Sequence, residues 1–309
     1  MAAGDLVTRP GHVQYGDLLL GPGTPYRWRD MSGWEEMPAL DSGTVPRAGA
    51  HGSFPGLLFA QSRRIGMDPL IIRAPASSIG AVVAALNAGT VPVEDEQPFV
   101  AWLDERGPLL AYARAVRRAV PVGKGYRLGV IVGGAIEWEA TDPRRYEVAE
   151  RTATATLPAA EPGLDWGVSD TAEEGLDWNV SGDVEAGLAF GEPGSTGALL
   201  AVNAGDAPTH PVIEFRGPVT RPALTNLRTG DVLEYDLPLA AGDVLTVDTR
   251  EGTVTLNGTA SRIYTVTARS VPEKTFTLAC GTTNLTFRAA PGSSDPAASV
   301  TVRWRSAYW

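Results

Sequence analysis

Apolar and polar residues alternate along short segments throughout the last third of the chain. Val212–Arg216 and Val232–Asp236 show this two-residue period, and Val244–Asp248 is joined to Thr253–Asn257 by a short link that ends in Gly252. Two such runs around a glycine predict a β-hairpin whose glycine takes a positive φ. Further runs follow at 263–266, 275–278, 284–288 and 299–305. Eight short strands at this spacing predict an antiparallel β-sandwich.

The first 150 residues mix short apolar runs with one helical pattern. Runs at 18–20, 57–59 and 70–72 are bounded by glycine, proline or charge, which is typical of short buried strands. After Pro75, the residues Ile79, Val82, Val83 and Leu86 fall on one face of a helix, and Gly89 follows as a stop signal. Further strand-like runs lie at 98–103, 109–113 and 128–138. Together these patterns predict that the first 150 residues form a sheet with one packed helix.

The stretch between 151 and 198 differs from both neighbours. Gly-Leu-Asp-Trp occurs at 163–166 and at 175–178, and Gly-Leu-Ala-Phe follows at 187–190, so the unit recurs every twelve residues. Eleven acidic residues and no lysine or arginine stand between Arg151 and Arg216. The repeat is compatible with a small β-meander or with a segment that orders on a partner.

These patterns predict a mainly-β protein with three parts. We expect an N-terminal β-barrel or sandwich-like domain with one packed helix over 1–150, and an acidic insertion or linker over 151–198. A C-terminal antiparallel β-sandwich completes the chain over 199–309.

The composition offers little for catalysis. Cys280 is the single cysteine, and the three histidines, His12, His51 and His210, lie in turn-like or loop-like sequence. The sequence contains no Gly-x-Ser-x-Gly elbow, no P-loop and no dinucleotide-binding glycine motif. We therefore expect no catalytic residue, no cofactor and no metal site.

Charge and hydropathy exclude two further classes. The net charge is −10, and no lysine- or arginine-rich run is interleaved with aromatic residues, so sequence-specific nucleic-acid binding is not expected. The longest apolar run, 128–136, has nine residues and is too short to span a bilayer. We expect a soluble protein.

Tryptophans leave one binding hypothesis open. Trp166 and Trp178 stand in the acidic repeat, where a flat indole could stack on a sugar ring. Tryptophan is also a large core residue, and the sequence does not separate the two roles. Trp166 and Trp178 are the candidate glycan contacts.

The C-terminal residues also form a longer pattern. It opens with PVIEFRGPVTRP at 211–222, continues with AGDVLTVDT at 241–249 and VTLNG at 254–258, and ends with NLTF at 284–287 and VRWRSAYW at 302–309. This pattern resembles the C-terminal domain of the siphovirus-type distal tail protein of long-tailed phages. The N-terminal half is similar more loosely, at Pro46-Arg47, at the His51-Gly52 turn, and through SRRI at 62–65 and TDPRRY at 141–146.

The resemblance implies a structural protein of the virion, located at the tail tip. In that family the N-terminal domain forms a ring, usually a hexamer, that continues the tail tube, and DNA and the tape measure protein pass through it. The C-terminal domain is a galectin-like sandwich. The implied partners are further copies of the chain, the tail tube protein, the tail-tip hub or tail-associated protein, the tape measure protein and receptor-binding proteins.

Two alternatives remain beside this interpretation. The chain could be a carbohydrate-binding tail protein that contacts the host surface, although the galectin sugar signature is missing from the sandwich. An enzyme such as a cell-wall hydrolase is the third possibility. The acidic stretch at 151–198 departs from the family pattern and resembles an insertion between domains.

Overall fold

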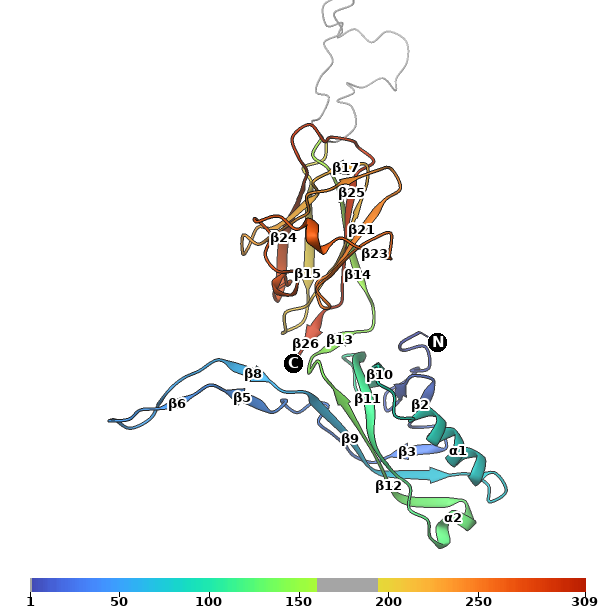
Figure 1. Cartoon of the computed structure of the whole chain (residues 1–309). Helices are drawn as coiled ribbons and strands as arrows, with labels where there is room; N and C mark the ends of the chain where they lie inside the picture. Colours follow the sequence, from blue (N-terminus) through green and yellow to red (C-terminus); the bar gives the residue numbers. More distant parts are fainter. Residues whose placement is uncertain (1, 160–193) are drawn as a thin grey trace, which may run out of the picture. The chain divides into compact units, whose positions relative to one another are not determined.

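The computed structural model of this protein describes residues 2–159 and 194–309. The chain forms two compact units (Figure 1). The first unit comprises Met1–Glu150, Gly205–Ala207 and Arg305–Trp309, and the second comprises Arg151–Ala204 and Pro208–Trp304. Both are built from antiparallel strands, which confirms the mainly-β prediction.

The first unit is organised around a ten-stranded sheet. Its main path runs β2–β1–β10–β11–β12–β9–β3, while β4 pairs with β9, and β13 pairs with β11 and β26. The strands are β1 (Val13–Tyr15), β2 (Leu18–Leu20), β3 (Tyr26–Trp28), β4 (Met31–Ser32), β9 (Arg63–Arg73), β10 (Gln97–Trp102), β11 (Pro108–Ala119), β12 (Val130–Ala140), β13 (Arg145–Glu147) and β26 (Ala307–Tyr308).

One face of this sheet forms the core of the first unit. Along β9 the side chains of Ile65 and Met67 are buried, and beyond a shift in the register with β12 so are Leu70 and Ile72, since alternate residues of a strand point to the same face. Aromatic rings fill the centre, where the Phe99 ring lies 5.1 Å from that of Trp138 and 5.3 Å from that of Trp34. Such ring pairs add to the stabilisation that burial itself provides.

The predicted helix is confirmed. Helix α1 (Ile79–Gly89) buries Ile79, Val83 and Leu86 in the core of the sheet, and the fourth predicted position, Val82, is half-buried. A second, short helix, α2 (Lys124–Leu128), interrupts the connection between β11 and β12. Neither helix is long and apolar enough to cross a membrane, and the described residues hold no other α-helix.

A narrow two-stranded ribbon precedes β9 (Figure 1). Strand β5 (Leu40–Ser42) pairs with β8 (Leu58–Ala60), and β6 (Val45–Pro46) pairs with β7 (Ser53–Phe54). We call residues 37–60 the arm. The apolar run at 57–59 was expected to be a buried strand, but its three side chains are exposed. That expectation is wrong because the ribbon has no second layer packed on it.

The last residues of the sequence return to the first unit. Strand β26 pairs with β13, with Tyr146 opposite Ala307. A small core that includes residues from three stretches of chain forms there, made of Val7, Val100, Leu110, Tyr146, Ala207 and Ala307. Gly205 is required at this point, because a Cβ on it would overlap the carbonyl oxygen of Ala307.

The second unit is an antiparallel sandwich. One sheet runs β14–β25–β16–β21–β22–β23 and the other runs β15–β24–β18–β19, with a separate pair β17–β20. The strands are β14 (Arg151–Thr156), β15 (Ala198–Asn203), β16 (Val212–Arg216), β17 (Val219–Thr220), β18 (Ala223–Asn226), β19 (Val232–Glu234), β20 (Pro238–Leu239), β21 (Val244–Asp248), β22 (Thr253–Leu256), β23 (Ala260–Ser261), β24 (Gly281–Arg288) and β25 (Ser299–Trp304).

Both sheets contribute to a single core, in which Phe215 from one sheet lies 5.9 Å from Phe287 of the other, between ring centroids. The predicted hairpin is confirmed as β21–β22, and Gly252 has the expected positive φ of 69°. Two predicted strands are wrong. The run at 263–266 contains the short 3₁₀ helix η1 (Ile263–Thr265) instead. The run at 275–278 begins at the last residue of a second 3₁₀ helix, η2 (Glu273–Thr275), and has only an isolated bridge at Leu278.

Candidate functional site

The arm exposes the densest set of large apolar side chains in the first unit. Leu57 is 73% exposed and Phe59 is 63% exposed. The complete set is Met37, Leu40, Val45, Phe54, Leu57, Leu58 and Phe59. Large exposed apolar side chains gathered on one short segment often mark an interaction surface. The arm is therefore the first candidate for a binding surface.

A buried arginine fixes the start of the arm. Arg63 donates hydrogen bonds from Nη1 to the carbonyl oxygens of Gly33, Trp34 and Glu36, at 2.7, 3.0 and 2.8 Å. Its Nε donates to the carbonyl of Pro143 at 2.7 Å. Burial, assisted by the positive charge of Arg145, lowers the pKa of Arg63 to about 10, so the group stays charged at neutral pH. The chain is thereby held in one path as it enters the arm.

A second arginine, Arg145, stabilises the same segment at the start of the arm. Arg145 forms an ion pair with Glu35, with Nη1 and Oε1 2.8 Å apart, and its guanidinium carbon lies 5.7 Å from the ring centroid of Trp34. Its Nη2 also donates to the carbonyl oxygen of Trp309. Arg63 and Arg145 belong to the SRRI and TDPRRY motifs noted in the sequence. The structure assigns both motifs to the support of the arm.

A second apolar surface lies at the connection between β11 and β12. We call this surface, made of Val116, Val122, Leu128, Val130 and Val132, the loop patch; all five side chains are exposed. Residues 106–136 carry six basic residues and no acidic one. Arg117 is paired with Glu137 at 2.6 Å, and Arg118 donates to the carbonyls of Asn87 and Thr90 at 3.1 Å. Arg106 and Arg114 are also ion-paired, with Asp104 and Glu139, so three of the six positive charges face a carboxylate.

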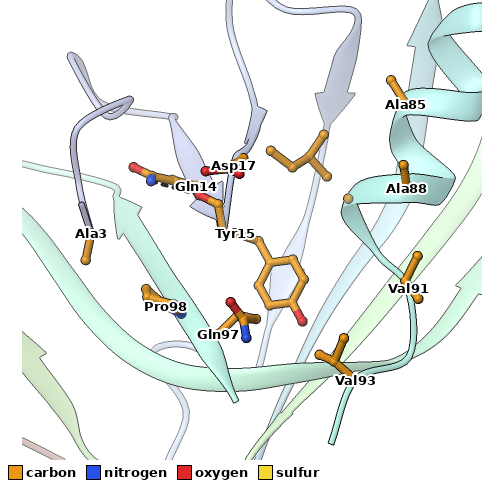
Figure 2. A pocket seen from close by; sticks show the side chains of 13 residues that line it. Ala3, Gln14, Tyr15, Asp17, Ala85, Ala88, Val91, Val93, Gln97 and Pro98 are labelled. Carbon is orange, nitrogen blue, oxygen red and sulfur yellow. Dashed lines mark hydrogen bonds between the residues drawn. The ribbon is translucent and has the colours of Figure 1, made fainter. Parts of the chain in front are cut away.

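A cavity of about 730 Å³ opens between α1, β1 and β10. Figure 2 shows Ala85 and Ala88 of the helix across from Gln14, Tyr15 and Pro98. Its polar groups serve the fold. The Gln14 Oε1 accepts hydrogen bonds from the backbone of Gly4 and Leu6, both at 3.1 Å, and the Tyr15 hydroxyl accepts one from Ala115 N at 3.0 Å. Burial raises the pKa of Tyr15, so its hydroxyl stays protonated. Gln14 and Tyr15 are thus held by contacts within the first unit.

The histidines considered in the sequence lie apart. His12 is buried and hydrogen-bonded to the backbone of Pro22 at 2.9 Å, which is a structural role. His51 is exposed at the turn of the arm, and His210 lies in the second unit. Within residues 2–159 and 194–309, no group of three His, Cys, Asp or Glu side chains could hold a metal ion.

The tryptophans do not form a common site either. Trp34 is buried beside Phe99, so it is a core residue. The candidate glycan contacts Trp166 and Trp178 lie outside the described residues. The sequence analysis missed the arm itself. A usable signal was present in residues 43–56, where four glycines and two prolines separate two apolar stretches.

Comparison with known proteins identifies related folds. Residues 204–308 match the family described as siphovirus-type tail component, C-terminal domain. No curated protein sequence matches the chain. The crystal structure of the Dit protein of phage SPP1, described as a paradigm of the hub adsorption apparatus in phages that infect Gram-positive bacteria, is similar over 96% of this chain and 99% of that one, with 13% identity and a TM-score of 0.63.

A second solved structure agrees. The baseplate of phage P2 in its activated conformation with calcium contains a chain that is 11% identical, covers 94% of this chain and 97% of its own length, and has a TM-score of 0.51. At these identities the similarity concerns the fold. The resemblance to siphovirus-type distal tail proteins is thus confirmed, by sequence for the C-terminal domain and by fold for nearly the whole chain.

Proposed function

We propose that this chain is a structural hub protein of a phage tail tip, and that it acts by assembly. Copies of the chain join into a ring, expected to be a hexamer, which connects the tail tube to the tip and leaves a channel for DNA. The observation that carries this proposal is the arm, with seven large apolar side chains on a ribbon that has no core of its own to fill. The relation in fold to the SPP1 hub protein supports it.

The arm suits a contact with a second copy of the chain. An exposed ribbon with free strand edges tends to associate, and a closed ring hides such edges and their apolar side chains. The arm is also held rigidly at its start by Arg63 and Arg145, so little conformational entropy would be lost there on binding. We assign the arm to the neighbouring copy.

The first unit offers two different surfaces, the arm and the loop patch. A contact between two different surfaces places copies head to tail, and such a contact closes into a ring when the rotation per copy fits. A contact of the arm with itself would give only a dimer. The presence of two separate apolar surfaces therefore favours a ring over a twofold pair.

The remaining partners follow from this assignment. The two rims of the ring would contact the tail tube protein on one side and the tail-associated protein of the tip on the other, and the tape measure protein would pass through the channel. The second unit would hold receptor-binding proteins. In this proposal the protein catalyses no reaction.

Light scattering and negative-stain images of the purified full chain test the proposal. We expect six-membered rings, and we expect the double variant Leu57→Ser, Phe59→Ser to be monomeric with an unchanged far-UV circular dichroism spectrum. The fold of the single chain should be kept because both side chains are already exposed there. Leu227→Ser, an exposed leucine of the second unit, is the matched control and should keep the ring. A wild-type chain that stays monomeric at all concentrations, or a double variant that still forms rings, would contradict the proposal.

A further inference from the structure

The second unit contains a shallow pocket with a different character from the apolar surfaces of the first. Its volume is about 440 Å³, and its lining includes Arg221, Glu234, Asp236, Tyr264, Thr267 and Arg269. These residues come from the segment before β18, the end of β19, and the η1 helix with the turn that follows it. The hub proposal makes no use of them.

Backbone hydrogen bonds hold the pocket in shape. Asp236 N donates to Thr265 O at 2.7 Å, and Thr267 N donates to Glu234 O at 3.1 Å. On the other side, Arg221 N donates to Leu237 O at 3.1 Å. The η1 turn is thus tied to the end of β19, so the pocket exists before any ligand binds. Preorganisation of this kind reduces the cost of binding.

The charges of the pocket are arranged in opposite pairs. Arg269 Nη1 lies 2.9 Å from Glu234 Oε2, and the Glu234 side chain is only 5% exposed, whereas that of Arg269 is 72% exposed. Arg221 Nε lies 3.4 Å from Asp236 Oδ1, and both of these side chains are exposed. Because each guanidinium faces a carboxylate, neither a phosphate nor a metal cation would find an uncompensated opposite charge. A neutral ligand with many hydrogen-bonding groups fits this balance.

An aromatic ring completes the pocket. Tyr264 is 75% exposed, and the neighbouring Ile263 and Val266 are also exposed. A flat ring beside polar pairs offers an apolar face for stacking together with adjacent donors and acceptors. A pyranose ring has the matching chemistry, since its C–H face is apolar and its hydroxyls are donors and acceptors at neighbouring positions.

From this geometry we infer that the pocket binds a neutral hexopyranose, such as an end sugar of an uncharged polysaccharide. Tyr264 stacks on the C–H face of the sugar. Arg221 and Asp236 bond its neighbouring hydroxyls, while the buried Glu234 keeps the floor polar and holds Arg269 in place. The site is separate from the acidic repeat and does not depend on ring formation.

Saturation-transfer NMR on the full chain tests this inference, with the methyl glycosides of glucose, galactose, mannose and N-acetylglucosamine as probes. We expect at least one probe to bind with a dissociation constant of about 1 mM, as is typical of a single contact of this size. Tyr264→Ala should weaken binding about tenfold or more, because the stacking surface is lost. Tyr264→Phe keeps the ring and should retain most of the affinity.

Control variants distinguish binding at this pocket from non-specific binding of sugar to exposed aromatic rings. Phe59→Ala removes another exposed ring, from the arm of the first unit, and should leave sugar binding unchanged. Asp236→Ala should reduce binding, because it removes an acceptor and frees Arg221. Binding of no probe to the wild-type chain, equal binding by Tyr264→Ala, or displacement of the sugar by inorganic phosphate would overturn the inference.

Discussion

Arg63 and Glu36 are joined by a hydrogen bond of 2.8 Å from the guanidinium Nη1 to the backbone carbonyl oxygen, at the point where the chain leaves the core for the arm. The same nitrogen serves Gly33 and Trp34, so one buried side chain organises a whole turn. Gly33 is itself required there, because it has a φ of 76° and a Cβ would overlap the carbonyl oxygen of Arg64. The direction of the arm thus depends on contacts made inside the core.

Replacement of Arg63 by lysine should therefore destabilise the first unit. A lysine ammonium cannot reproduce the planar fork that reaches Pro143 and the carbonyls just before the arm together. We expect a loss of about 2 to 3 kcal/mol in the free energy of unfolding, measured by urea denaturation. Arg64→Lys, at the exposed neighbouring position, should change the free energy by less than about 0.5 kcal/mol. Similar losses for the two variants would contradict this role of Arg63.

The contact between Gly205 and the last strand gives a second prediction. In Gly205→Ala the added methyl group overlaps the carbonyl oxygen of Ala307, so β26 must move away from β13. We expect a loss of about 1 to 3 kcal/mol, as for other overpacked sites. Gly80→Ala has open space inside helix α1 and should instead stabilise the protein by about 0.5 to 1 kcal/mol. Thermal unfolding of the two variants should show opposite shifts.

Asp142 predicts a dependence of stability on pH. Burial would raise the pKa of this carboxyl, but the hydrogen bond and charge of Arg144 outweigh burial, and the pKa in the folded protein lies below the usual 3.8. A lowered folded pKa means that the stabilisation is fully present above pH 3.8 and is lost as the pH falls through the folded value.

The comparison of wild type with Asp142→Asn measures this effect. We expect the variant to be less stable by about 3 kcal/mol near pH 7, because Arg144 loses the charge of its partner in a largely buried pair. The difference should be constant down to about pH 4 and shrink at lower pH. Asp41→Asn, at an exposed position in the arm, should give no such difference. If the difference in the free energy of unfolding between wild type and Asp142→Asn grew as the pH fell, the pKa of Asp142 would not be lowered in the folded protein.

The second unit contains a buried pair of its own. The Tyr235 hydroxyl donates to Glu273 Oε1 at 3.1 Å, and burial together with that carboxylate raises the pKa of Tyr235. Tyr235→Phe leaves the carboxylate without this donor, so we expect a loss of about 1 to 3 kcal/mol in urea unfolding. Tyr264→Phe, at an exposed tyrosine of the same unit, should be close to neutral. Equal stability of Tyr235→Phe and the wild type would contradict this account.

Local patterns were the part of this fold that the sequence could predict. Helix α1 follows from the spacing of Ile79, Val83 and Leu86, and the β21–β22 hairpin follows from two alternating runs around Gly252. The helix and the hairpin are both determined by residues close together in the sequence, and for that reason the sequence pattern predicts them correctly. The run Ile263–Thr265 alternates too weakly to decide between a strand and a turn, and its exposed Tyr264 belongs to the pocket instead of the core.

The exposed arm and the return of the last strand could not be predicted in this way. The apolar run 57–59 has the composition of a buried strand, and only the absence of a packed layer makes it a surface. Strand β26 pairs with β13 across more than 150 residues of sequence, and nothing near Ala307 indicates that partner. Contacts of this kind depend on the whole topology, so periodicity carries no information about them.

The return of residues 305–309 to the first unit has a consequence for biosynthesis. The ribosome makes these residues after the entire second unit, yet Ala307 fills the small core beside Tyr146, and β26 completes the pairing of β13. During translation β26 can therefore be added to the first unit only after the second unit has been made. The small core beside Tyr146 is thus completed late, because the whole second unit lies in the sequence between Tyr146 and Ala307.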